Sequence, residues 1–224
     1  MVRVISFDLD GTLVKKTFAD AFWLEGVPQI YTDEKKISIE EAKKSTLKQY
    51  EEIGPGRIEW YDPVYWFSRF KLKTDWRDIL EKYRYHVEIY PDTVNVINRL
   101  SKKFDLIIIS NANRSFIDME LEETKIGKYF SRVFSTTSDF NTVKNISIVY
   151  SKICNKLKIN SSDIIHVGDD KEFDYVSPKK AGIESFYLDR KKESKNSFTV
   201  YNLEDFEKII SILVTKGTTD AKWE

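Results

Sequence analysis

Short apolar runs recur along this sequence, and they restrict its fold more than any other feature. They are rich in Val, Ile and Phe, show little alternation with polar residues, and occupy residues 2–8, 105–110, 132–135, 163–167 and 185–188. Strands of this kind are covered on both faces, as in a parallel sheet. Apolar residues at helical spacing predict helices between and after these runs, at 93–103, 146–157 and 203–214. Strands that alternate with helices predict an α/β fold with a three-layer, Rossmann-like parallel sheet.

Residues 15–87 interrupt this alternation. They show no strand pattern, and four stretches have the features of helices: 17–31, 38–53, 61–70 and 76–86. The sequence Gly54-Pro55-Gly56 predicts a turn between two of them. We therefore predict a discontinuous α/β catalytic core over residues 1–14 and 88–215, a small all-helical cap over residues 15–87, and a C-terminal tail over residues 216–224.

The composition excludes several classes of partner. The chain has 36 basic and 36 acidic side chains, so its net charge gives no reason to expect binding to nucleic acid or to an anionic membrane. Cys154 is the only cysteine, which rules out an intrachain disulfide. The sequence shows neither a signal-peptide pattern nor an apolar stretch of about 18 residues. We expect a cytoplasmic protein, and the sequence does not determine its oligomeric state.

Acidic, basic and hydroxyl side chains stand where the predicted strands end. The carboxyl ends of parallel strands meet at one edge of a sheet, where ligands bind in open α/β folds. The residues placed at this edge are Asp8, Asp10, Ser110, Lys144, Asp169 and Asp174. Asp8 and Asp10 are two residues apart, so on a strand both side chains point to the same side. We expect all six to converge on one site.

A cluster of carboxylates stays ionised only if positive charge joins it. Lys144 supplies one charge, and a divalent cation supplies the rest. The candidate ligands are all oxygens, which favours Mg²⁺ over zinc. Mg²⁺ held by few carboxylates keeps positions for phosphate oxygens and water. The pattern therefore indicates a phosphoryl-transfer centre in which a carboxylate is able to attack phosphorus.

Four motifs in this order resemble the haloacid dehalogenase-like phosphohydrolase superfamily. They are Asp8-Leu-Asp10-Gly-Thr-Leu, Ser110 after an apolar strand, Lys144, and Gly168-Asp169-Asp170-Lys-Glu-Phe-Asp174. The resemblance covers residues 1–14 and 88–190, and the insertion lies where this family places a helical cap. Asn145 follows Lys144 where a proline is usual, and Lys152 or Lys156 are the alternatives. The spacing of 25 residues between positions 144 and 169 favours Lys144.

The resemblance implies a role for each of these residues. Asp8 is the nucleophile, and Asp10 is the general acid and then the general base. Mg²⁺ is bound by the carboxylates of Asp8 and Asp169 and by the main-chain carbonyl of Asp10. The phosphoryl group is contacted by Thr12, Ser110, the main chain of Asn111, and Lys144. Asp174 orients Lys144 or a metal-bound water, and Asp170 supports the site.

The expected function is that of a Mg²⁺-dependent phosphatase, which hydrolyses a small phosphorylated metabolite through an aspartyl phosphate. Phosphoglycolate, sugar phosphates and nucleoside monophosphates all remain open as substrates. The alternatives are a haloacid dehalogenase, a phosphomutase and a binding protein without catalytic activity. Dehalogenases of this fold usually lack the second aspartate, so Asp10 argues against the first. His166 is expected to be structural, and the aromatic run 60–67 is expected to pack between cap helices more than to line a substrate pocket.

Overall fold

Six parallel strands form the central sheet of the structure, a computed structural model that describes residues 2–194 and 198–215. In order across the sheet they are β3 (Arg132–Ser135), β2 (Asp105–Ser110), β1 (Val4–Phe7), β4 (Ile164–Gly168), β5 (Glu184–Leu188) and β6 (Thr199–Val200). The five apolar runs form the five strands predicted from them. The sixth strand was not predicted, because two residues are too few to show a pattern. The predicted tail from residue 216 lies outside the described residues.

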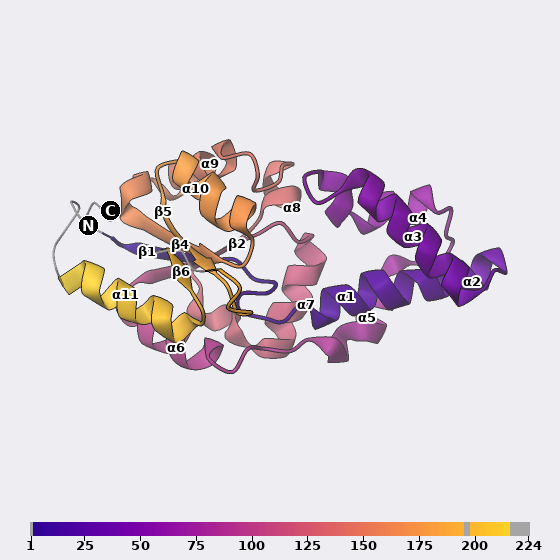
Figure 1. Cartoon of the computed structure of the whole chain (residues 1–224), viewed down its shortest axis with the longest axis horizontal. Helices are drawn as coiled ribbons and strands as arrows, with labels where there is room; N and C mark the ends of the chain where they lie inside the picture. The colour runs from indigo at the N-terminus through magenta and orange to yellow at the C-terminus, as the bar shows by residue number, and fades with distance from the viewer. Residues whose placement is uncertain (1, 195–197, 216–224) are drawn as a thin grey trace.

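Helices cover both faces of this sheet (Figure 1). One face carries α6 (Thr93–Leu100), α7 (Arg114–Thr124) and α11 (Leu203–Thr215), and the other carries α9 (Ile148–Leu157) and α10 (Ser177–Lys180). Shorter elements are α8 (Thr136–Phe140), η4 (Ile126–Tyr129) and η5 (Ser161–Asp163). Alternate residues of β1 face opposite layers. Ile5 and Phe7 pack with α6 and α11, whereas Val4 packs with α9. This arrangement confirms the predicted three-layer α/β fold.

Residues 15–87, here called the cap, form a helical lobe at one end of the sheet (Figure 1). The lobe consists of α1 (Thr17–Ala21), the π-helical turn η1 (Phe22–Gly26), α2 (Val27–Lys35), α3 (Ile39–Ile53), η2 (Ile58–Tyr61), α4 (Pro63–Arg69), α5 (Trp76–Tyr83) and η3 (Arg84–His86). The elements α1, η1 and α2 follow one another directly, which explains why the sequence shows a single helical stretch there. In this lobe, which is described throughout, no strand is present.

Capping residues determine where the cap helices begin. Ser38 and Glu41 form a capping box at the start of α3, in which each side chain accepts a hydrogen bond from the other residue's backbone N–H. Asp62 and Asp75 accept backbone hydrogen bonds at the starts of α4 and α5. Such a cap stabilises a helix by about 1 kcal/mol. None of the helices in the described part of the chain is long and apolar enough to cross a membrane.

Aromatic side chains build the interior of the cap. Its buried cluster includes Phe18, Phe22, Tyr50, Trp66, Phe67, Phe70, Trp76 and Tyr83. Phe116 of α7 belongs to the same cluster, so it connects the cap to the α/β layers. Trp66 and Phe67, from the aromatic run at 60–67, pack between cap helices as predicted.

Gly26 provides a test of how closely the cap helices pack. A Cβ atom on Gly26 would lie 2.6 Å from Cγ2 of Ile79 and 2.9 Å from Cε2 of Tyr83. Alanine is the better helix former by about 1 kcal/mol, but moving two packed side chains costs about 1–3 kcal/mol. We expect Gly26→Ala to lower the free energy of unfolding by about 1 kcal/mol in urea denaturation.

Gly127→Ala is the matched control for this substitution. A Cβ atom on Gly127 would lie 3.7 Å from Cβ of Leu121, which is an ordinary contact. We expect its free energy of unfolding to stay within about 0.5 kcal/mol of the wild type. Equal effects of the two substitutions would contradict the close packing of η1 against α5.

Candidate active site

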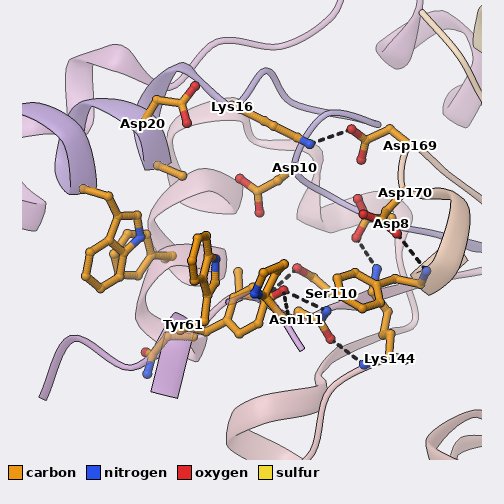
Figure 2. Close-up of a pocket in the computed structure, with 18 of the residues that line it drawn as sticks. Asp8, Asp10, Lys16, Asp20, Tyr61, Ser110, Asn111, Lys144, Asp169 and Asp170 are labelled. Carbon is orange, nitrogen blue, oxygen red and sulfur yellow. Dashed lines mark hydrogen bonds and ion pairs between the residues drawn. The ribbon is translucent and has the colours of Figure 1, made fainter. Parts of the chain in front are cut away.

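A cavity of about 410 Å³ lies between the carboxyl ends of the central strands and the cap. Figure 2 shows residues that line it, with Asp169 and Asp170 on one side and Asp20 and Tyr61 on the other. Of the residues singled out in the sequence, the lining includes Asp8, Asp10, Ser110, Asn111, Lys144, Asp169, Asp170 and Asp174. Thr12 is instead fully buried, and its hydroxyl donates a hydrogen bond of 3.2 Å to Oδ2 of Asp8.

Asp8 and Asp10 reach the cavity from a turn and not from a strand. β1 ends at Phe7, so the alternation of strand side chains does not explain why both carboxylates face the same space. The intervening Leu9 is fully buried, and Gly11 continues the turn with a φ of 81°. A Cβ atom on Gly11 would lie 2.3 Å from Oδ2 of Asp169. Glycine at this position therefore allows the two acidic motifs to approach each other.

Lys144 is buried between two carboxylates. Its Nζ lies 2.5 Å from Oδ1 of Asp8 and 2.5 Å from Oδ1 of Asp174, and it donates a third hydrogen bond of 3.2 Å to the carbonyl of Ile109. The side chain is only 2% exposed. Lys144 lies in a turn before α9, close to the start of the helix predicted over residues 146–157. Its backbone N–H is held there by Oδ1 of Asn111 at 2.9 Å.

Asp174 is the better stabilised of these two carboxylates. It follows β4 in the π-helical turn η6 (Lys171–Val176), and Gly168 leaves room for it, since a Cβ atom there would lie 2.4 Å from its Cγ. Asp174 accepts hydrogen bonds from Lys144, from His166 and from the backbone N–H of Asp170. Burial opposes its ionisation, but Lys144 and His166 outweigh that effect and lower the pKa of Asp174 to about 2. Asp8 has the opposite balance, because burial raises its pKa well above the usual range despite Lys144.

His166 supports Asp174, a contact that the sequence did not indicate. The imidazole is fully buried, and burial lowers the pKa of His166, so the ring is neutral at physiological pH. Nε2 lies 3.1 Å from Oδ1 of Asp174, and Nδ1 lies 2.7 Å from Oγ of Ser6. The neutral ring therefore donates from Nε2 to Asp174 and accepts from Ser6. The available signal was a single polar residue within the apolar run 164–167.

Asp10 has a second acidic neighbour that the sequence analysis missed. Glu120 is fully buried on α7, and its carboxyl group lies beside that of Asp10. Within the described residues, neither of its oxygens nor Oδ1 of Asp10 receives a hydrogen bond. Burial raises the pKa of both groups, and the charge of Asp10 raises that of Glu120 further. Both environments therefore favour the protonated form of these two carboxyl groups. Glu120 lies four residues after Phe116, on the same side of a helix, and this spacing was the signal for a buried position.

The acidic residues at the cavity base fit a hard divalent cation. Carboxylate oxygens of Asp8, Asp169 and Asp174 lie within 4.8 Å of one another. Asp174 accepts three hydrogen bonds, from Lys144, His166 and a backbone N–H, whereas Asp8 accepts two and Asp169 pairs with Lys16, so Asp8 and Asp169 are the more available ligands. Both are oxygen donors of the kind that Mg²⁺ prefers. Lys16, which the sequence analysis missed, lies 2.7 Å from Oδ2 of Asp169 and supplies a counter-charge there.

Asp170 turns away from this cluster. Its Oδ1 accepts hydrogen bonds from the backbone N–H groups of Glu172 and Phe173, at 2.9 and 2.8 Å. Asp170 therefore caps η6, the turn that positions Asp174.

Asn111 links three parts of the site. Its Oδ1 accepts hydrogen bonds from Oγ1 of Thr136 at 2.6 Å and from the backbone N–H of Lys144 at 2.9 Å. Its Nδ2 donates a hydrogen bond of 3.2 Å to the hydroxyl of Tyr61 in the cap. The neighbouring Ser110 accepts a hydrogen bond from the backbone N–H of Ala112 at 3.0 Å. The loop after β2 is thus fixed against both the Lys144 turn and the cap.

Known proteins resemble this chain in sequence. A family model described as haloacid dehalogenase-like hydrolase matches residues 5–188. The pyrophosphatase PpaX of Oceanobacillus iheyensis is 24% identical over 224 residues, which cover 95% of this chain and 97% of the relative. The GMP/IMP nucleotidase YrfG of Escherichia coli is 24% identical over 136 residues. The latter match covers 60% of this chain and only 60% of the nucleotidase.

Solved structures resemble the whole fold. A HAD phosphatase from Thermococcus onnurineus has a TM-score of 0.83 at 22% identity, covering 94% of this chain and 98% of that one. A 2-haloacid dehalogenase from Pseudomonas syringae has a TM-score of 0.68 at 18% identity, covering 95% and 99%. At these identities the likeness shows the fold alone.

The two carboxylates beside Lys144 are expected to affect stability differently. Asp174→Asn removes the better stabilised partner of a buried ammonium, so we expect it to lower the free energy of unfolding by about 3–5 kcal/mol near pH 7. The folded-state pKa of about 2 lies below the unfolded value. The stabilisation from Asp174 is therefore present above about pH 4 and is lost as the pH falls toward 2. Urea denaturation between pH 7 and pH 3 should show the gap between wild type and variant narrowing with acidity.

Asp8→Asn is the matched control. The raised pKa of Asp8 means that its carboxylate opposes folding above that pKa, and asparagine removes this effect while Asp174 still pairs with Lys144. We expect this variant to match or exceed the wild-type unfolding temperature. A loss as large as that of Asp174→Asn would contradict the assignment of Asp174 as the main partner of Lys144.

Proposed function

Because this chain belongs to the haloacid dehalogenase-like hydrolase family, we propose that it is a Mg²⁺-dependent phosphatase. It hydrolyses a small phosphorylated metabolite through an aspartyl phosphate on Asp8. The observation that carries this proposal is the buried ammonium of Lys144, 2.5 Å from carboxylate oxygens of both Asp8 and Asp174 at the cavity base. Such a charge attracts a phosphoryl group to the nucleophile.

In the first step, a carboxylate oxygen of Asp8 attacks phosphorus, and the bond from phosphorus to the leaving oxygen breaks. Asp10 donates its proton to that oxygen, which leaves as an alcohol. Burial raises the pKa of Asp10, which is the direction that favours a proton donor. Burial and the charge of Asp10 raise the pKa of Glu120, which favours a neutral carboxyl group beside Asp10.

In the second step, water attacks the phosphorus of the aspartyl phosphate. Asp10, now ionised, takes a proton from this water, and the bond between phosphorus and Asp8 breaks to release inorganic phosphate. The cap covers the cavity and limits the access of bulk water to the intermediate.

Several groups offset the negative charge of the phosphoryl oxygens. Lys144 does so from the cavity base, and the hydroxyl of Ser110 and the main chain of Asn111 supply hydrogen bonds. Mg²⁺ would be held by the carboxylates of Asp8 and Asp169 and by the main-chain carbonyl of Asp10, and it would supply further positive charge. Thr12 positions Asp8 through its hydrogen bond to Oδ2.

The alternatives fit this site less well. A halide leaves as a stable anion and needs no proton, so a dehalogenase has no use for Asp10 as a general acid. The likeness to a solved haloacid dehalogenase, at 18% identity, concerns the fold. A phosphomutase returns the phosphoryl group to a second hydroxyl of its substrate, and analysis of the products separates it from a phosphatase.

Phosphate release from para-nitrophenyl phosphate and from metabolite phosphates tests the proposal. We expect turnover with Mg²⁺, none with EDTA, and recovery when Mg²⁺ is restored. Asp8→Asn should lower kcat at least about 10³-fold because it removes the nucleophile. Turnover that persists in EDTA, or in Asp8→Asn, would overturn the metal requirement or the nucleophile assignment respectively.

Lys144→Met tests the buried charge at nearly constant side-chain volume. We expect kcat to fall about 10²- to 10³-fold, because a positive charge beside the phosphoryl group is lost. Lys152→Met is the control, since Lys152 is exposed on α9. If Lys152→Met proved the more damaging of the two, the assignment of the third motif to Lys144 would be wrong.

A further inference from the structure

The cavity has two ends of different chemistry. The end formed by the α/β layers carries the charged groups described above. The cap end is formed mainly by Trp23, Leu24, Leu47, Tyr50, Trp60 and Tyr61, with Phe116 of α7 beside them. We call these seven residues the aromatic wall. The aromatic wall lines the side of the cavity where the leaving group of a phosphomonoester would lie.

The aromatic wall is built to hold its rings in place. The π-helical turn η1 brings Trp23 to the cavity, and π-helical turns are common at functional sites. The ring of Trp23 stacks on Phe116 with an interplanar angle of 2° and meets Tyr50 edge-on at 83°. The hydroxyl of Tyr61 donates to the carbonyl of Pro55 at 3.1 Å and accepts from Asn111. The wall is therefore preorganised before any ligand arrives.

Protein atoms leave part of this wall uncovered. Leu24 and Leu47 are 44% and 47% exposed, and Trp23, Trp60 and Tyr61 are only half-buried. Tyr61, which the sequence placed in a packing run, and its neighbour Trp60 differ in this respect from the buried Trp66 and Phe67. Apolar surface gathered in a cavity beside polar catalytic groups is typical of a binding site for an apolar ligand.

The charges of the lining disfavour a second anionic group on the substrate. Lys16 and Lys144 are the cations among the described lining residues, and both pair with carboxylates: Lys16 with Asp169, and Lys144 with Asp8 and Asp174. Asp20 stands at the cap side of the cavity, as Figure 2 shows. A second phosphate or a carboxylate on the substrate would be repelled by Asp20, and no unpaired cation among these lining residues would offset that repulsion. A ring N–H or amino group can instead donate a hydrogen bond to Asp20.

We propose that the substrate is a phosphomonoester whose alcohol carries an uncharged aromatic or heteroaromatic ring, and that the ring stacks on the aromatic wall at Trp23, Trp60 and Tyr61. This inference rests on the proposed phosphatase function and narrows its substrate class. A nucleobase, a pyridine ring and a phenyl ring share the required chemistry. Phosphoglycolate and bisphosphates lack it, as do simple sugar phosphates.

A panel of substrates tests the inference with the full chain and Mg²⁺. Nucleoside monophosphates, pyridoxal phosphate and para-nitrophenyl phosphate represent the three kinds of ring. Glycerol phosphate, glucose 6-phosphate and phosphoglycolate represent substrates without one. Acetyl phosphate reports the phosphoryl site alone, because it has no ring and its leaving group needs no proton. We expect a nucleoside monophosphate or pyridoxal phosphate, whose leaving groups are alkyl alcohols, to exceed the esters without an aromatic ring about tenfold or more in kcat/KM, and the ranking among the three aromatic substrates identifies the ring.

Two variants connect this preference to the aromatic wall. Trp60→Leu should lower the ratio of kcat/KM for the best ring-bearing substrate to that for acetyl phosphate about tenfold, mainly through KM. Leu47→Arg places a cation at an exposed position of α3 and should raise kcat/KM for phosphoglycolate severalfold. Tyr85→Leu is the control, because Tyr85 is an aromatic residue of the cap that is 72% exposed and outside the lining. It should leave the ratio unchanged.

The outcomes separate the two levels of the proposal. If the enzyme hydrolyses acetyl phosphate, and if phosphoglycolate or glucose 6-phosphate is hydrolysed as well as or better than the aromatic substrates, the ring inference is overturned and the phosphatase proposal stands. A ratio that is unchanged in Trp60→Leu would overturn the role of the wall. Absence of phosphate release from every compound, acetyl phosphate included, would overturn the phosphatase proposal and with it this inference.

Discussion

A lysine ammonium buried between two carboxylates is the interaction on which the rest of the site depends. Lys144 can remain charged at 2% exposure because Asp174 and Asp8 both lie 2.5 Å from its Nζ. Breaking such an arrangement leaves an uncompensated buried charge, which is strongly destabilising. Other residues are arranged around this requirement: His166 donates to Asp174, and Asn111 holds the turn that carries Lys144. The same arrangement leaves Asp8 with the less favourable environment, which suits a group proposed to react.

Close approach of backbone segments makes this concentration of charge possible. Gly11 and Gly168 lie where any Cβ atom would collide with Asp169 or Asp174. Gly168 is the last residue of β4, and Gly11 lies in the turn that follows β1. The side chains of Asp169 and Asp174 therefore occupy the space that a Cβ atom at position 11 or 168 would take. The cap closes the other side of the cavity with aromatic side chains. Its own core is a second aromatic cluster, which Phe116 of α7 joins.

Local patterns in the sequence were sufficient for the strands, the helical cap and the residues at the strand ends. Apolar runs, helical spacing and capping residues such as Ser38 are properties of neighbouring residues, so they can be read without the fold. The topology of a parallel sheet then explains why Asp8, Ser110 and Asp169 line one cavity although they are far apart in the chain. Their catalytic roles remain predictions from the family resemblance. The two-residue strand β6 carried no such local signal.

Only the tertiary structure decided which side chains contact one another where the local sequence gives no signal. Glu120 lies in a run of acidic residues, Lys16 looks like a surface lysine, and His166 was expected to be structural, yet they contact Asp10, Asp169 and Asp174 respectively. Asp8 and Asp10 share the cavity because of a turn after Phe7, and the aromatic run at 60–67 divides between the cavity and the cap core. The sequence by itself determined the fold class and which motifs meet. The pairing of charges was decided by packing, because burial and distance between remote segments set the energy of each charged group.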